Sequence, residues 1–108
     1  MKRWASIILL AASTAQADSN IGFTDGNKLY ERLNGEATDL LYAYGYISGV
    51  SDTGQGVTHC VDRNVTVGQL SDMVKQFLSA NPGDRHYQAD TLVIHVLKSS
   101  FPCRKSRT

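Results

Sequence analysis

The feature that most constrains this chain is a pair of cysteines, Cys60 and Cys103, behind an N-terminal segment typical of export signals. In an oxidising compartment outside the cytoplasm, two cysteines normally form a disulfide. A bridge between these two would close a loop of about 44 residues and contribute on the order of 4 kcal/mol in the chain-entropy model. That is a large share of the stability of a small domain. A reactive thiol is the weaker alternative.

The N-terminal segment over residues 1–17 has the pattern of a secretory signal peptide. Two basic residues are followed by an apolar stretch over residues 4–14, and Ala-Gln-Ala then forms a small-x-small cleavage site. The apolar stretch is too short to cross a bilayer, and no cysteine follows the cleavage site for lipid attachment. We therefore expect cleavage near Ala17, no membrane anchor, and a single mature domain over residues 18–108.

The charge of the mature chain limits its partners. Removal of Lys2 and Arg3 with the signal lowers the basic residues from eleven to nine, against ten acidic residues. A nearly neutral chain argues against nucleic acid or an anionic membrane surface as the main partner. A basic cluster remains at the C-terminal end, in Arg104, Lys105 and Arg107, where a solvated tail is expected.

The first two predicted helices cover about residues 25–33 and 36–53, separated by an Asn-Gly stop signal. The second helix is apolar nearly all round, which predicts that it is buried at the centre of the fold. Gly45 and Gly49 lie one turn apart on it, so we expect a neighbouring backbone to pack closely there, beside Tyr46. Three tyrosines of this helix are expected to fill the core more than an interface: Tyr42, Tyr44 and Tyr46.

Two more helices are expected in the second half of the chain. Thr66 and Gln69 fit a capping box at the start of the third helix, which the Asn-Pro-Gly sequence at residues 81–83 ends. The fourth helix is expected to begin near Asp84, and Phe101-Pro102-Cys103 closes it. No segment alternates with period two, so no sheet is expected beyond incidental pairing. The sequence therefore predicts an all-α fold, a small bundle of about four helices stapled by one disulfide.

The residues of this chain offer no evident chemistry. His86 and His95 are nine residues apart on the predicted fourth helix, which places them on opposite sides, and His59 adjoins a cysteine that the disulfide uses. No nucleophile motif, phosphate-binding loop or close pair of carboxylates is present. We expect solvated or helix-end histidines, no metal, no cofactor and no enzymatic activity.

A series of short motifs resembles a known family by its order and spacing. The motifs include Gly26-Asn27, Gly45-Tyr46-Ile47, Gly49, Cys60, Val65-Thr66, Gln69-Leu70, Asn81-Pro82, His86, Leu92-Val93 and Phe101-Pro102-Cys103. Together they are similar to the Rap/Tai family of periplasmic immunity proteins. Characterised members are small, exported and helical, and they protect Gram-negative bacteria from type VI secretion effectors that cleave peptidoglycan. The resemblance implies that this chain binds an amidase effector in the periplasm and blocks its active site. Because family members often act as dimers, the resemblance also allows a homodimer.

An inhibitor of this kind needs a rigid body and a protruding element that enters a cleft. Two connections are candidates, residues 54–64 and residues 81–86. We favour the second connection because Pro82 stiffens it and because it offers polar and charged groups to an effector: Asn81, Asp84, Arg85 and His86. The alternative interpretation is a plain turn between helices, with Asp84 as a cap.

The sequence departs from the family at one point. Members commonly carry a second disulfide at the positions that match Leu33 and Ala43, and both residues are apolar here. We expect a packed contact to replace that bridge. An alternative function from another class is a periplasmic acid-stress chaperone, which is also small, exported, helical and disulfide-stapled. A chaperone of that type would bind unfolded proteins at about pH 2–3. A structural envelope protein is a third possibility.

Overall fold

The computed structural model describes residues 23–104, so the predicted signal peptide, its cleavage site and the last residues of the basic cluster lie outside the described residues. Within this range the chain forms four α-helices and one short 3-10 helix. Their bounds are α1 Gly26–Leu33, α2 Ala37–Gly54, α3 Val67–Ala80, η1 Pro82–Asp84 and α4 Ala89–Ser100. Over residues 23–104, only two isolated bridges pair extended backbone, Asp25 with Gln88 and Gln55 with His59. The predicted all-α fold is confirmed.

Local cap residues determine where two of the helices begin. Asp25 precedes α1 and accepts a hydrogen bond from the backbone of Lys28 at 2.8 Å. Thr66 accepts from the Gln69 backbone at 3.1 Å, and the Gln69 side chain accepts from the Thr66 backbone at 2.8 Å. The predicted capping box is therefore confirmed, and each such cap stabilises its helix by about 1 kcal/mol.

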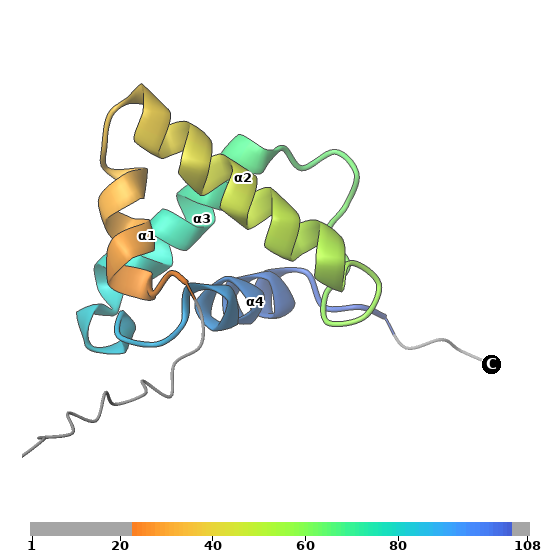
Figure 1. Cartoon of the computed structure of the whole chain (residues 1–108). Coiled ribbons are helices and arrows are strands. Elements are labelled where there is room, and N and C mark those ends of the chain that lie inside the picture. The colour runs from red at the N-terminus through yellow and green to blue at the C-terminus, as the bar shows by residue number, and fades with distance from the viewer. Residues whose placement is uncertain (1–22, 105–108) are drawn as a thin grey trace, which may run out of the picture.

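The helix α2 packs against all three other α-helices (Figure 1). In Figure 1 it crosses the molecule diagonally, with α1 at its N-terminal end and α4 below its C-terminal half. The buried apolar side chains of the four helices form one core: Leu29, Leu33, Ala43, Ile47, Leu70, Val74, Leu78, Ala89, Leu92, Val93, Val96 and Leu97. Leu33 and Ala43 both belong to this core, as expected if a packed contact replaces the bridge that the resemblance implies.

The prediction that α2 is buried all round is wrong. Only Ala43, Ile47 and Ser51 on one side of the helix are buried, whereas Leu41 is 69% exposed and Tyr42 is 43% exposed. The other three α-helices cover one side of α2 and leave the opposite side exposed to solvent. Glycine and tyrosine contribute to the apolar character of the sequence, but both tolerate contact with water.

The prediction that α4 begins near Asp84 is also wrong, since the helix begins at Ala89. The preceding residue, Gln88, is extended and pairs with the chain that enters α1. The Ala89 backbone N–H donates to the Thr24 carbonyl at 2.9 Å. These long-range backbone bonds replace the first turn that a helix from Asp84 would have formed. His86 therefore lies in a turn and not on α4.

The predicted disulfide joins Cys60, in the loop after α2, to Cys103, just past α4, with Cα atoms 4.9 Å apart. The Cys60 backbone also donates to the Phe101 carbonyl at 2.8 Å. The covalent bond and the backbone bond together fasten the long loop between α2 and α3 to the C-terminal end of α4. The predicted disulfide between Cys60 and Cys103 is therefore confirmed.

The loop after α2 is organised around His59, which is fully buried at the end of α2, as the helix-end alternative for the histidines predicted and the solvated one did not. Its Nε2 donates to the Ser51 carbonyl at 2.9 Å, and its Nδ1 forms a hydrogen bond with the Thr58 hydroxyl at 2.7 Å. A Cβ atom on Gly54 would lie 2.7 Å from Cε1 of this ring. A side chain is therefore excluded at Gly54, and the histidine closes the end of α2.

Candidate functional site

The four residues predicted to contact an effector lie in one segment, residues 81–88, which we call the α3–α4 turn. The 3-10 helix η1 forms its first half. The Asp84 backbone donates to the Asn81 carbonyl at 3.0 Å, and the Tyr87 backbone donates to the Asp84 carbonyl at 3.2 Å. The turn is thus a folded unit with its own hydrogen bonds, and it links the two helices in a fixed direction.

Two of the predicted effector-contacting residues point toward the protein. The Asn81 side chain donates to the Phe77 carbonyl at 2.8 Å and caps the end of α3. Arg85 donates through Nε to the Leu78 carbonyl at 2.7 Å, and its guanidinium carbon lies 4.0 Å from the ring centroid of Tyr30. Both residues therefore hold the turn in place, which is the role that the plain-turn interpretation describes.

Contacts of α1 with α3 and with the turn perturb Tyr30. A hydrogen bond with Ser79 and the positive charge of Arg85 lower the pKa of the Tyr30 hydroxyl, against the opposing effect of burial. The phenolate form is favoured because both partners interact more strongly with a negative oxygen. The lowering therefore comes mainly from Ser79 on α3, with a smaller part from Arg85 of the turn.

The outer surface of the turn is formed by the residues that remain exposed: Pro82, Gly83, His86 and Tyr87. The rings of His86 and Tyr87 stack with centroids 4.1 Å apart, and Tyr87 is 51% exposed. Asp84 is half-buried at the end of η1. Of the four predicted residues, His86 is the most available to another molecule. Tyr87 was missed, although an aromatic side chain beside a turn is a typical interface signal.

A second surface lies between α2 and α4, where a groove of about 590 Å³ opens to solvent. We call it the α2–α4 groove. Its lining includes Gly45, Tyr46, Gly49 and Val50 of α2, and Asp90 and Ile94 of α4. The volume is within the range of pockets that bind ligands or side chains of a partner.

The expected role of Gly45 and Gly49 needs correction. A Cβ atom on either glycine would meet no atom within 4 Å, so no backbone of the described residues packs against them. The reason is that α4 crosses near these glycines without closing over them, and both lie open to the groove. Tyr46 does pack against the core and is half-buried. Burial and, after it, the negative charge of Asp90 raise the pKa of Tyr46.

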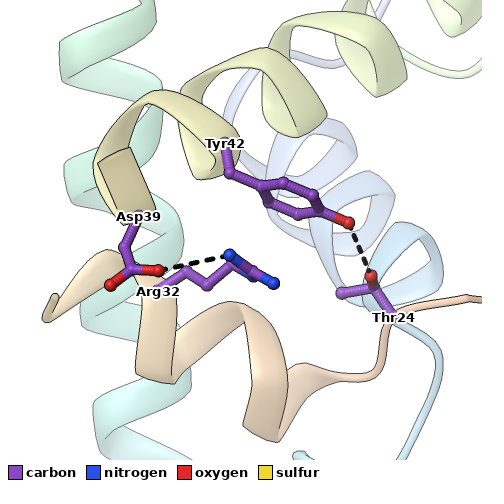
Figure 2. A network of polar contacts seen from close by, with 4 residues as sticks. All are labelled: Thr24, Arg32, Asp39 and Tyr42. Carbon is purple, nitrogen blue, oxygen red and sulfur yellow. Dashed lines mark hydrogen bonds and ion pairs between the residues drawn. The ribbon is translucent and has the colours of Figure 1, made fainter. Parts of the chain in front are cut away.

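A third set of contacts ties the entering chain to α1 and α2 (Figure 2). Arg32 and Asp39 form an ion pair with 3.2 Å between Nη1 and Oδ1, and the Arg32 guanidinium lies 3.9 Å from the ring centroid of Tyr42. The Tyr42 and Thr24 hydroxyls are 3.3 Å apart. Both charged side chains are about two-fifths exposed. The set therefore orients Tyr42 and offers no reactive group.

The residues that the structure describes include no cluster of three or more histidine, cysteine, aspartate or glutamate side chains that would hold a metal ion. Both cysteines of the chain are in the disulfide. Over the same range, every helix is too short or too polar to cross a membrane. The groups described here can bind another molecule through shape, stacking and charge.

The described part of the chain is thus a small all-α domain with one disulfide, an exposed turn and an open apolar groove. A family model described as Rap1a immunity proteins matches residues 25–103. The chain belongs to this family, and the resemblance to the Rap/Tai immunity proteins is confirmed. The match begins at the cap of α1, Asp25, and ends at the disulfide residue Cys103. No individual protein of curated function matches the sequence.

Membership in a family of immunity proteins implies a non-enzymatic role and a protein partner, namely a secreted effector. It also suggests that the protein is exported. The coarse function expected from the sequence, an immunity protein, therefore agrees with the family.

Proposed function

We propose that this protein acts in the periplasm, where it binds and inhibits a type VI secretion effector that is a peptidoglycan amidase. The observation that carries the proposal is the match to Rap1a immunity proteins over residues 25–103, a span that includes all four α-helices. Cleavage of a signal peptide near Ala17 is part of the proposal, because an immunity protein must reach the compartment where such an effector meets its substrate.

The α3–α4 turn is the element that we assign to the amidase cleft. His86, Tyr87 and Pro82 form its exposed surface, with Asp84 at the edge. Asn81 and Arg85 contribute indirectly: their hydrogen bonds to the end of α3 hold the turn in a fixed conformation. A turn that is already ordered loses little conformational entropy on binding, which favours affinity.

Affinity capture tests the proposal directly. Mature, oxidised protein over residues 18–108 is immobilised and exposed to periplasmic and secreted extracts of the source strain and its competitors. We expect stoichiometric retention of one peptidoglycan amidase, identified by mass spectrometry. The purified pair is then assayed on isolated cell-wall sacculi, where the mature protein should abolish release of peptide stems. Sedimentation of the protein alone and of the complex measures the proposed homodimer.

Matched variants locate the binding surface. His86→Ala with Tyr87→Ala removes two exposed rings, and we expect about a tenfold or greater loss of affinity, as for aromatic anchors of other interfaces. The control is Lys98→Ala with Asp72→Ala, which changes two exposed residues of α4 and α3 outside the turn. Equal affinity of the two double variants would remove the turn from the proposal. Retention of no amidase by the wild type would remove the amidase itself.

The same capture distinguishes the chaperone alternative. A chaperone would retain many unrelated proteins in acid at about pH 2–3. At that pH, protonation of its own carboxylates destabilises its compact state and exposes apolar surface that binds unfolded proteins. An immunity protein should retain one protein at neutral pH and show no such broad binding.

A further inference from the structure

The α2–α4 groove combines an apolar wall with a single charged group. Val50 and Ile94 line it from α2 and α4, and Val57, which is 80% exposed, stands at its end. Asp90 is the one charged side chain in its lining. An exposed apolar surface of this kind, with a few polar groups, is typical of interaction sites.

The Asp90 carboxylate has no cationic partner among residues 23–104. The one ion pair in that range joins Arg32 and Asp39, and the closest polar contact of Asp90 is the Gln88 side-chain amide at 3.4 Å. Asp90 lies in the first turn of α4, where the helix dipole favours a negative charge without neutralising it. Its charge still acts on the groove, since it raises the pKa of Tyr46. The groove is therefore negative at this end.

This charge limits what can cover the groove. A second copy of the chain placed groove to groove would bring another Asp90 carboxylate into a partly desolvated site and would bring no cation from the groove lining. Opposed like charges at an interface disfavour association strongly. The complementary occupant is one that supplies a positive charge together with apolar side chains.

We propose that the α2–α4 groove docks a segment of the effector that presents apolar side chains and one lysine or arginine. The cation pairs with Asp90 beside the Tyr46 ring, and the apolar side chains contact Val50 and Ile94. Gly45 and Gly49 carry no side chain on the α2 side of the groove, so the main chain of that segment can approach α2 closely. The proposal rests on the proposed function, and it adds a second contact surface to the turn.

The groove and the α3–α4 turn are neighbours along the chain. Asp90 follows Gln88, the last residue of the α3–α4 turn, by two positions, so the negative end of the groove begins where the turn ends. One partner can therefore contact both surfaces. The turn supplies stacking groups, and the groove selects a cationic apolar segment.

The chemistry of the groove can be tested without the effector. The probes are 4-phenylbutylamine, 4-phenylbutan-1-ol and 4-phenylbutyrate, which share a shape and differ in charge. Amide NMR shifts of the mature protein should map the amine to Gly45, Gly49 and Thr53, with at least about fivefold tighter binding than the carboxylate. Asp90→Asn should remove that preference. Equal binding of amine and carboxylate, or shifts outside the groove, would overturn the proposal.

The second arm uses the amidase captured in the first experiment. Gly49→Leu fills the groove without a clash at its Cβ atom, and Thr38→Leu adds the same side chain to an exposed position of α2 outside the groove. We expect Gly49→Leu to weaken binding at least about tenfold and Asp90→Asn about fivefold, with Thr38→Leu unchanged. Urea unfolding of each variant confirms that the fold is retained.

The two failures are distinguishable. If the wild type binds the amidase and the groove variants bind it equally well, the groove inference is wrong and the proposed function stands. If the wild type binds no amidase, the proposed function is wrong, and the charge series of probes alone decides whether the groove selects an apolar cation.

Discussion

The Cα atom of Arg85 lies 2.9 Å from the position that a Cβ atom on Gly26 would occupy, and the Arg85 carbonyl oxygen lies 2.8 Å from it. The same oxygen accepts a hydrogen bond from the Asn27 backbone at 2.9 Å. The α3–α4 turn therefore rests directly on the backbone at the start of α1, and a glycine is required there.

This close approach predicts opposite effects for two glycine substitutions. Gly26→Ala forces the turn away from α1 and should lower the free energy of unfolding by about 1–3 kcal/mol, as overpacking does elsewhere. Gly45→Ala meets open space and should raise stability by up to about 1 kcal/mol through helix propensity. Urea unfolding followed by circular dichroism measures both. Equal shifts of the two midpoints would show that the turn does not rest on Gly26.

Ser71 offers a stabilising substitution. Its hydroxyl is buried, and within residues 23–104 it has no hydrogen-bond partner. Ser71→Ala removes an unsatisfied polar group at nearly constant volume, so the free energy of unfolding should rise by about 1 kcal/mol. Ser99→Ala, at an exposed position of α4, is the control. A loss of stability in Ser71→Ala would reveal a hydrogen bond that the hydroxyl makes in solution.

Tyr46 makes the stability of the protein dependent on alkaline pH. Its pKa is raised in the folded state, so folding holds the phenolic proton more tightly than the unfolded chain does. This contribution is complete below the ordinary tyrosine pKa of about 10 and is lost as pH rises through the raised value. Tyr46→Phe lacks the titration. The difference in unfolding free energy between the two proteins should therefore shift in favour of Tyr46→Phe above about pH 10. Parallel curves from pH 8 to pH 11 would contradict the assignment.

The positions of the missing family disulfide can be tested by restoring it. Leu33→Cys with Ala43→Cys should form a second bridge in the oxidised protein, because the resemblance places these residues at the bridged positions and both lie in the core. Thiol titration of the denatured, unreduced protein should then find no reactive thiol. Two titratable thiols would mean that the alignment of the first two helices is wrong. Leu33→Cys alone, with one thiol, calibrates the assay.

The sequence predicted features that depend on neighbours in the chain. The capping box of Thr66 and Gln69 is local, so the start of α3 was predicted closely, and the predicted start of α1 is one residue from the observed one. The disulfide was predictable because only two cysteines are present. The family motifs gave the function class for the same reason, since they can be read without knowing which helices meet.

Features that depend on distant contacts were predicted poorly. Spacing pointed to Gly45 and Gly49 as points of close approach, whereas the glycines that exclude a side chain include Gly26 and Gly54. Their neighbours in space, Arg85 and the buried His59, come from other parts of the fold or from a loop whose path the sequence does not indicate. The late start of α4 has the same cause, because the chain entering α1 supplies its competing hydrogen bonds.

The disulfide has a consequence for a chain exposed to proteases. Residues 60–103 form a covalently closed ring, and the exposed Pro82-Gly83 segment of the α3–α4 turn lies inside it. A single cut at this site opens the ring but sheds no fragment, since the two pieces stay joined through sulfur. This exposed turn is therefore one where a nick leaves both halves of the domain attached to each other.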